Sequence, residues 1–436
     1  MKSLKKIIVL FVLSIFSLSC SEDHLYTEEE SQKSLLKENS LRNNNNNISN
    51  LPVYSRNKLI IQYLLGTPNS VKSNLRDIFG VQNYEICEHC EDKNIELWIF
   101  DKGILIEPKK TTIETGSGGG IEYIVEVDYE FVFGIDLSNP YLGSDSDTSF
   151  YPYIKSDNEG VTVAVLDTGI APTIGADTSP IFTSPFLYNA SNDGYTGVES
   201  GWDFVNDDPN CFDDNGGRHG TVVSSIIHNV LNNDEIPHQI LPIKIANRRG
   251  QISYFGLLCG FNFALNHAQV VQMSFGWYDD GSGDQLNTIF SELLNLYPNV
   301  MVVTSAGNDG FNNDVVSHYP SNYPQDNLIA VAAANKKVLF PSSIGLPDPN
   351  IAGFSNYGIV NVDFFAPGEG IPFLGYDMDG TSFAAPFVSG VVARIVQSNP
   401  GFTPNNVLDA LTSYGEPCPV TFSTTRKVKH NRIIMP

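Results

Sequence analysis

Five short apolar runs in the second half of the chain most constrain what it can fold into. They are residues 161–166, 239–245, 269–274, 299–304 and 327–332, and each has the length of one buried strand. Amphipathic stretches with helical spacing, such as 253–267 and 285–296, lie between them. Buried strands that alternate with helices are typical of a parallel sheet covered on both faces. An α/β fold is therefore predicted from about residue 155 onward, with its chemistry beyond the carboxyl ends of the strands.

A smaller α+β unit is predicted ahead of this sheet, over residues 53–134. Residues 59–64 read as a buried strand, and Pro68-Asn69-Ser70 begins a helix that Gly80 ends. Apolar residues alternate over 95–99 as in a strand. From 121 to 133 they alternate mainly with acids, which predicts a long strand with one apolar and one mostly acidic face. No second helix is evident between 104 and 118.

Charge and the first residues exclude some classes of protein. The 436 residues include 26 Lys+Arg and 49 Asp+Glu, a net charge of −23, so we expect no nucleic-acid partner. Residues 1–19 have a basic start and a short apolar run, which predicts a secretory signal peptide. The polar residues 20–52 are predicted to be a flexible tether.

Cys20 follows the apolar run in the order Ser17-Leu18-Ser19-Cys20. This segment resembles the lipobox of bacterial lipoproteins, although the usual Leu stands three residues before the Cys and here stands two before it. The resemblance implies a lipid on Cys20, export across the inner membrane, and a place in the outer membrane or on the cell surface. An ordinary signal peptide with an incidental Cys is the alternative.

Five cysteines then remain, so they cannot all pair with one another. Cys87-Glu-His-Cys90 suggests a metal site, but structural zinc usually needs two such pairs and the sequence has one. A local disulfide or two packed thiols is therefore favoured, and no metal ligands are assigned. The pairing is open for Cys87, Cys90, Cys211, Cys259 and Cys418.

Three segments supply the groups needed for acyl transfer. Asp167 stands just past the 161–166 strand, His219 begins a helical stretch, and Ser382 stands where a Gly-led turn enters another helix. An acid, a base and a hydroxyl nucleophile are the parts of a catalytic triad.

In this chain order, the three segments resemble the subtilisin-like serine proteases (family S8). The resemblance runs from about 155 to 430 and includes Ser274-Phe275-Gly276, 305–308, Phe354-Ser355 and Ala366-Pro367-Gly368. It implies a subtilisin-like catalytic domain over 135–436 that acts as a serine endopeptidase on proteins or peptides.

The resemblance also implies a role for each matching residue. Ser382 attacks the scissile carbonyl, His219 takes its proton, Asp167 orients the imidazole, and Asn308 stabilises the oxyanion. Substrate lies extended along one segment and against another, and a histidine lies near the pocket floor. These substrate-binding residues are Ser274, Phe275 and Gly276, then Ser305, Ala306 and Gly307, then His318.

Some positions depart from the family pattern. Val222 stands where a second His is usual, and Phe383 and Phe387 replace the usual Met and His. The insertion that makes one family calcium site is missing, so we expect no required cofactor. Calcium elsewhere remains open at Asp207, Asp208, Asp213 and Asp214, although a solvated acidic loop is favoured. Because sedolisin-type relatives have Glu and Asp where this chain has His219 and Asn308, activity is expected near neutral pH or above.

The 53–134 unit resembles the ferredoxin-like inhibitory prodomain of these proteases, which implies a zymogen that cuts itself between about 134 and 150. A fixed accessory domain is the alternative. The leading interpretation is a secreted, lipid-anchored endopeptidase. A catalytically silent peptide-binding surface lipoprotein and an ester hydrolase are the competing ones.

Overall fold

The computed structural model describes residues 51–90, 93–116, 121–137, 142, 160–171, 181–182, 186–190, 200–278, 288–339, 350–417 and 426–435. All of them belong to one compact unit, Ile48–Pro436. The predicted signal peptide, most of the tether, Cys20 and Cys418 lie outside the described residues. No helix in the described ranges has the length and apolarity needed to cross a membrane.

The main sheet has the strand order β17-β18-β14-β13-β11-β9-β5-β7-β6. Neighbouring strands are parallel except β17 and β18. Each of the five apolar runs forms a strand, which confirms the parallel α/β prediction. The strands are β5 (Val161–Asp167), β6 (Trp202–Asp203), β7 (His238–Lys244), β9 (Val270–Met273), β11 (Met301–Ser305), β13 (Leu328–Ala334), β14 (Phe364–Pro367), β17 (Glu416–Pro417) and β18 (Arg432–Ile433).

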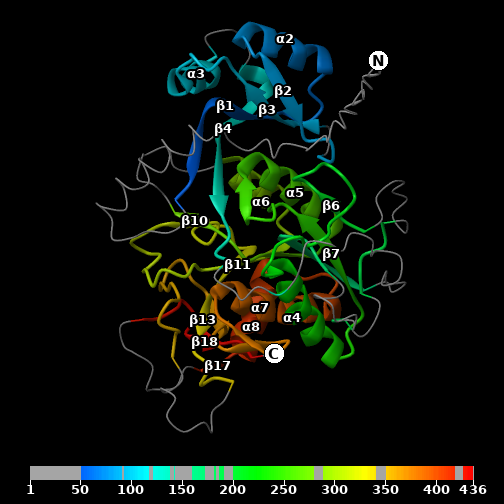
Figure 1. Cartoon of the computed structure of the whole chain (residues 1–436), viewed down its shortest axis with the longest axis vertical. Helices are drawn as coiled ribbons and strands as arrows, with labels where there is room; N and C mark the ends of the chain where they lie inside the picture. The colour runs from blue at the N-terminus through cyan, green and yellow to red at the C-terminus, as the bar shows by residue number, and fades with distance from the viewer. Residues whose placement is uncertain are drawn as a thin grey trace, which may run out of the picture. The chain divides into compact units, whose positions relative to one another are not determined.

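Helices cover both faces of this sheet (Figure 1). Val163 and Val165 of β5 share a core with α4 (His219–Asn233), α7 (Thr381–Ser398) and α8 (Pro404–Tyr414). Ala164 and Leu166, which point to the opposite face, share a core with α5 (Tyr254–His267) and α6 (Thr288–Leu296). Successive residues of a strand face opposite sides, so both sides of β5 are apolar.

The N-terminal unit is an antiparallel sheet in the order β2-β3-β1-β4. Its helices α2 and α3 pack on one face. The sequence prediction missed α3 because only Ile106 and Ile113 are buried in it, and its middle holds Pro108 and two threonines. The elements are β1 (Val53–Tyr63), α2 (Asn69–Phe79), β2 (Asn83–Ile86), β3 (Ile95–Ile99), α3 (Ile106–Glu114), the 3-10 turn η2 (Ile121–Tyr123) and β4 (Ile124–Gly134).

The acidic face of β4 is partly buried against the rest of the chain. The edge of β4 pairs with β8 (Gln251–Ser253), with Phe133 opposite Ile252. Glu130 accepts hydrogen bonds from Ser253 Oγ (2.8 Å) and Phe255 N (2.9 Å) at the start of α5. Asp128 accepts from the backbone N–H groups of Thr288 and Ile289, both at 3.0 Å, at the start of α6. These carboxylates therefore cap two helix N-termini, where negative charge is favoured.

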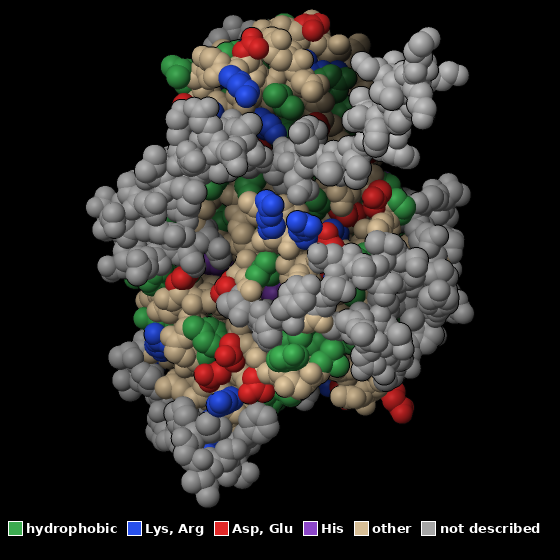
Figure 2. All heavy atoms as spheres, viewed as in Figure 1, with side chains coloured by type: hydrophobic (Ala, Val, Ile, Leu, Met, Phe, Trp, Pro, Cys, Tyr) green, Lys and Arg blue, Asp and Glu red, His purple; other side chains and the backbone are tan. Residues whose placement is uncertain are grey.

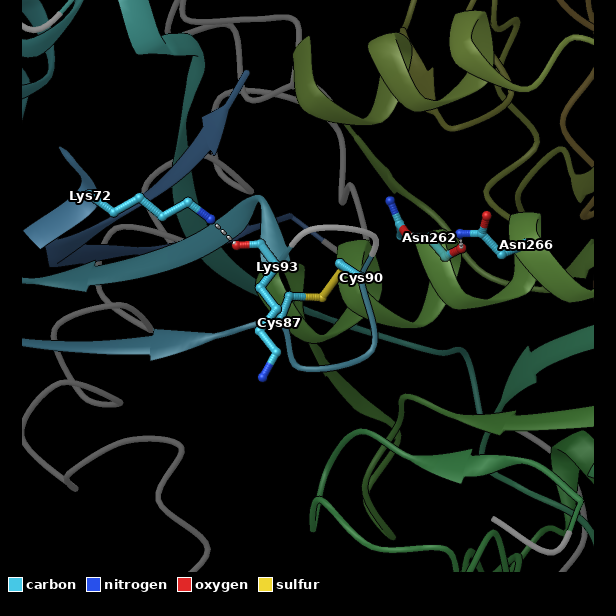
Figure 3. Close-up of a disulfide and its surroundings, with 6 residues drawn as sticks. All are labelled: Lys72, Cys87, Cys90, Lys93, Asn262 and Asn266. Carbon is cyan, nitrogen blue, oxygen red and sulfur yellow. Dashed lines mark hydrogen bonds between the residues drawn. A yellow bond between two sulfur atoms is a disulfide. The ribbon is translucent and has the colours of Figure 1, made fainter. Parts of the chain in front are cut away.

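Two small sheets and one disulfide complete the described fold. The sheets are β10 (Trp277–Tyr278) with β12 (His318–Tyr319), and β15 (Ile371–Phe373) with β16 (Tyr376–Met378). Cys87 and Cys90 form a local disulfide beside α5 (Figure 3), as one of the favoured interpretations predicted. Cys211 and Cys259 are buried free thiols. On the coloured part of the face in Figure 2, acidic and basic side chains are intermixed.

The capping carboxyl groups predict a pH-dependent stability. Burial raises the pKa of Asp128 to about 6 and that of Glu130 to about 7. The folded chain therefore holds these protons more tightly than the unfolded chain, whose pKa values are about 4. Their contribution to stability is fully present below about pH 4, the pKa of the unfolded chain. It is lost as the pH rises through 6 to 7. We expect the Tm of the unsubstituted chain to fall as the pH rises from about 4 to about 7. The Asp128→Asn/Glu130→Gln double variant has no carboxyl group to titrate at these two positions, so its Tm should fall less.

Calorimetric Tm measurements across this pH range test the prediction. Asp101→Asn, which changes an exposed carboxyl of the same unit, is the control and keeps the parent pH dependence. An unchanged pH dependence in the double variant would contradict the prediction.

Candidate active site

Two of the predicted site residues form a buried pair at the carboxyl end of β5. Asp167 is the last residue of β5 and His219 is the first residue of α4, and neither is exposed to solvent. His219 Nδ1 lies 2.8 Å from Asp167 Oδ1 and 3.0 Å from Oδ2. The backbone N–H of Thr168 donates to the same Oδ1 at 2.7 Å. The carboxylate therefore fixes the orientation of the imidazole ring.

Neighbouring carboxylates set the charge preference of His219. Burial alone lowers its pKa, but the charge and hydrogen bond of Asp167, together with Asp213 and Asp136, raise the pKa above the ordinary value. Asp213 is fully buried and accepts from Thr221 Oγ1 at 2.8 Å and from Thr221 N at 3.1 Å. Among the described residues, His219 Nε2 has no hydrogen-bond partner. The ring is thus held at one nitrogen and available at the other.

Ser382 is the second residue of α7 and is hydrogen-bonded to Ser274 rather than to His219. Its Oγ donates to the Ser274 carbonyl at 3.0 Å, and Ser274 Oγ donates to the Ser382 carbonyl at 2.7 Å. The next residue, Phe383, has its ring 5.6 Å from the His219 ring. Hydrogen bonds between a nucleophile and its base often form only in the substrate complex, so this geometry does not exclude the pairing.

Asn308, the predicted oxyanion residue, lies beside the N-terminus of α7. Its Oδ1 accepts from Thr381 N at 2.9 Å and from Thr381 Oγ1 at 2.8 Å. These contacts fix the orientation of the amide and leave Nδ2 to donate to another partner. Asn308 Nδ2 donates to Oδ2 of Asp136 at 3.2 Å, and Asp136 belongs to the segment that follows β4.

The two predicted substrate-binding segments diverge beside Ser382. β9 and β11 are paired up to Met273 and Thr304, and Ser274–Gly276 and Ser305–Gly307 follow them. His318 lies between these segments, because a Cβ on Gly276 would come within 2.3 Å of its Cε1 and one on Gly307 within 3.1 Å of its Nε2. Burial lowers the pKa of His318 to about 3, so its ring is neutral.

Tyr278 and Asn356 share this place, although the sequence reasoning missed both. Asn356 Nδ2 donates to Tyr278 Oη at 2.8 Å and to the Ala306 carbonyl at 3.0 Å. A Cβ on Gly307 would lie 3.1 Å from that Tyr278 oxygen. The only sequence signal was the position of Asn356 directly after the Phe354-Ser355 marker.

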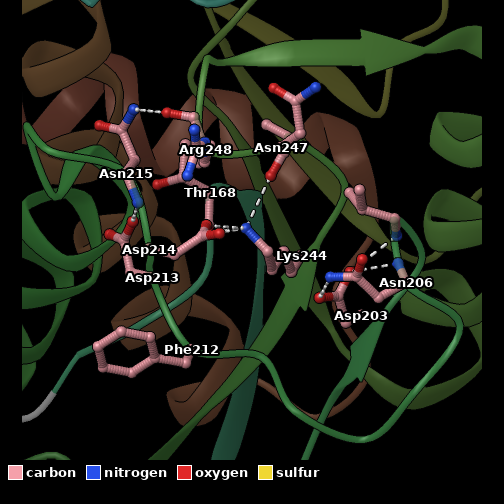
Figure 4. Close-up of polar contacts among 12 residues, drawn as sticks. Thr168, Asp203, Asn206, Phe212, Asp213, Asp214, Asn215, Lys244, Asn247 and Arg248 are labelled. Carbon is pink, nitrogen blue, oxygen red and sulfur yellow. Dashed lines mark hydrogen bonds and ion pairs between the residues drawn. The ribbon is translucent and has the colours of Figure 1, made fainter. Parts of the chain in front are cut away.

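The acidic loop before α4 is solvated only in part: Asp207 is exposed and Asp208 is half-buried, as the sequence favoured, but the two later acids have protein partners. Asp213 is buried, and Asp214 Oδ1 accepts from Lys244 Nζ at 2.7 Å (Figure 4). The Lys244 ammonium also donates to the carbonyls of Thr168 and Ala246, both at 2.9 Å. The buried cation compensates the acids, which a sequence pattern cannot show because Lys244 is distant in the chain.

One group of metal-ligand residues occurs within the described ranges, Cys87 with Cys90 and Cys259. Its residues do not fit a metal in this form, because the disulfide between Cys87 and Cys90 leaves one thiol to act as a ligand.

Comparisons with known proteins identify the family of the chain. Alkaline elastase YaB from Bacillus is 31% identical over 256 residues, covering 56% of this chain and 56% of its own length. Thermitase from Thermoactinomyces vulgaris is 28% identical over 270 residues, covering 59% of this chain and 81% of thermitase. The structure of fervidolysin from Fervidobacterium pennivorans, a keratinolytic enzyme related to subtilisin, matches with a TM-score of 0.55 at 20% identity. That match covers 83% of this chain and 58% of fervidolysin, and it shows the fold alone.

The chain thus spans little more than half the length of the elastase. The family model described as the subtilase family, peptidase S8, matches residues 158–414. That match includes more than half of the chain, together with Asp167, His219, Asn308 and Ser382. The chain belongs to the subtilase family.

Proposed function

We propose that the protein is a serine endopeptidase that cleaves peptide bonds through an acyl-enzyme intermediate. The observation that carries the proposal is the buried Asp167–His219 pair, in which Nδ1 is held and Nε2 is available. His219 takes the proton of Ser382 through Nε2 as the hydroxyl attacks the scissile carbonyl, and later gives it to the leaving amine. Asp167 stabilises the imidazolium that forms in between.

Asn308 and the start of α7 stabilise the oxyanion in this proposal. Because Thr381 occupies the acceptor oxygen of Asn308, the Nδ2 group is the end that faces a substrate. The backbone N–H of Ser382, in the first turn of α7, is the second donor. Negative charge is favoured at a helix N-terminus, so both donors and the helix dipole act on the same developing charge.

We further propose that the N-terminal unit is a ferredoxin-like prodomain that inhibits this site until it is cut off. Three contacts support this role: the caps from Asp128 and Glu130, the pairing of β4 with β8, and Asp136 on Asn308. Ile135 N also donates to the Gly250 carbonyl at 2.8 Å. The chain that leaves the unit thus runs to the donor that an oxyanion would need, and cleavage between about 134 and 150 would free it.

Substitutions at the candidate site test the activity directly. We expect Ser382→Ala to abolish hydrolysis of a peptide p-nitroanilide. Asn308→Ala and Asn308→Asp should each lower kcat by about 10²–10³-fold, because both remove the Nδ2 donor. Asn308→Ala should also lower Tm, because it removes the acceptor for Thr381.

Asn399→Ala, at the other end of α7, is the control and keeps full activity. Peptide hydrolysis that survives in Ser382→Ala would exclude the proposed nucleophile. Absence of any peptide hydrolysis in the processed parent enzyme would favour the silent peptide-binding interpretation.

The pH profile of kcat/KM tests His219 as the base. Burial lowers the pKa of His219, but the charge and hydrogen bond of Asp167, together with neighbouring carboxylates, outweigh burial and raise the pKa above 6.5. The acid limb of the profile should therefore lie above that pH. The base must be neutral to accept a proton, so activity rises as the pH passes this pKa. Asp213→Asn removes one of the charges that favour the imidazolium, so it should move the limb to lower pH. A limb that stays in place or moves upward would contradict the assignment.

The position of His318 predicts a preference for small residues before the scissile bond. Its ring fills the place where Ser274–Gly276 and Ser305–Gly307 diverge next to Ser382, which leaves little volume for a large side chain. We expect a peptide p-nitroanilide with Ala before the scissile bond to be cut faster than the matching substrate with Phe at that position. In His318→Gly, kcat/KM for the Phe substrate divided by kcat/KM for the Ala substrate should rise about tenfold or more. His267→Ala, a histidine change on α5, is the control, and an unchanged ratio in His318→Gly would contradict the prediction.

We also propose that the protein is exported and anchored by a lipid on Cys20, which lies outside the described residues. The lipobox-like segment before Cys20 supports this proposal. Labelled fatty acid should be incorporated into the full chain and be absent from Cys20→Ala. Label that persists in Cys20→Ala would refute the anchor.

A further inference from the structure

Three buried cysteines meet where the N-terminal unit packs on α5. The Sγ atoms of Cys87, Cys90 and Cys259 all lie within 4.8 Å of one another. Cys87 and Cys90 belong to the loop between β2 and β3, whereas Cys259 is on α5. Each is at most 5% exposed. One disulfide and one free thiol thus share a single apolar site, and Figure 3 shows the disulfide loop beside α5.

Contacts on both sides hold this loop in place. His89, between the two loop cysteines, has its ring 4.2 Å from that of Trp202 and 5.7 Å from that of Phe263. Within its own unit, Lys72 Nζ donates to the Lys93 carbonyl at 2.7 Å (Figure 3). Because Phe263 follows Cys259 by one turn of α5, the His89 contact keeps the loop against the helix that carries the free thiol.

We propose that this cluster is a thiol–disulfide exchange site that can tie the N-terminal unit covalently to α5. In the exchange, the Cys259 thiolate attacks the sulfur of Cys87 or Cys90 and forms a new S–S bond. The Cys87–Cys90 bond breaks, its electron pair leaves with the other sulfur, and that thiolate takes up the proton that Cys259 released. One disulfide and one thiol are present before and after, so no outside oxidant or reductant is needed.

Chain entropy favours the Cys87–Cys90 disulfide in the unfolded chain and a disulfide from Cys259 once the chain has folded. In the unfolded chain Cys87 and Cys90 are three residues apart, so their pairing closes the shortest loop and forms most readily. Folding then brings Cys259 to the pair. A bond from Cys259 closes a much longer loop, and it therefore constrains the unfolded chain more and stabilises the folded form more.

The surroundings of Cys259 slow the exchange once the chain has folded. Burial raises the pKa of its thiol well above the ordinary value, and the carboxylates of Glu130, Glu85 and Asp207 add to this effect. The thiolate is therefore scarce at neutral pH, and either isomer persists after it has formed. An N-terminal unit tied in this way stays on the protein after any cut in the chain that follows it, whether or not Ser382 makes that cut.

Disulfide mapping of the full chain tests the proposal without using its activity. The folded protein is kept at about pH 9 without added thiol, alkylated with N-ethylmaleimide and digested with pepsin at acid pH, where exchange stops. We expect mass spectrometry to find peptides that join Cys259 to Cys87 or Cys90. Cys211→Ser, which removes the other buried free thiol in the described part of the chain, should keep this cross-link, and Cys259→Ser should remove it.

Two results would overturn the proposal. One is Cys259 recovered only in alkylated form, with Cys87 joined only to Cys90. The other is three alkylated thiols in a protein that carries one bound zinc ion, which would make the cluster a metal site. Both are read on the unsubstituted chain, so they do not depend on the folding of a variant.

Discussion

Burial of a parallel sheet on both faces is the constraint on which the rest of the structure depends. Along β5 the side chains from Val163 to Leu166 enter two apolar cores in alternation. Asp167 is the next residue, and it is already covered by α4. The Asp167–His219 pair is therefore shielded from water and held in a fixed geometry. The base is already oriented before the reaction, so no free energy is needed to reorient it.

The second organising feature is the acidic face of β4. The carboxyl groups of Asp128 and Glu130 are buried, and they accept hydrogen bonds from the N-termini of α6 and α5. The same strand continues into Ile135 and Asp136, which are hydrogen-bonded to Gly250 and Asn308. One strand thus links the docking of the N-terminal unit to the occupation of the candidate site. Release of the unit would break both sets of contacts together.

Local patterns predicted the strands and helices of the larger part because apolar runs and helical spacing are properties of short segments. The same holds for the site residues that stand directly at strand ends and helix starts, such as Asp167 and His219. The helix α3 was missed because only two of its residues face the core. Residues that act through distant partners were also missed: Asn356 reaches Tyr278, and the cation of Lys244 opposes the rise that burial causes in the pKa of Asp213. No local pattern records such contacts.

The central claim is that Ser382 cleaves peptide bonds and that this activity cuts the chain between the N-terminal unit and the larger part. The intact mass of the chain from residue 21 onward, beside the same chain carrying Ser382→Ala, tests it most directly. The account predicts a cut between about residues 134 and 150 in the first protein and an uncut chain in the second. If both chains stay full length, or if both are cut at the same place, the account is contradicted.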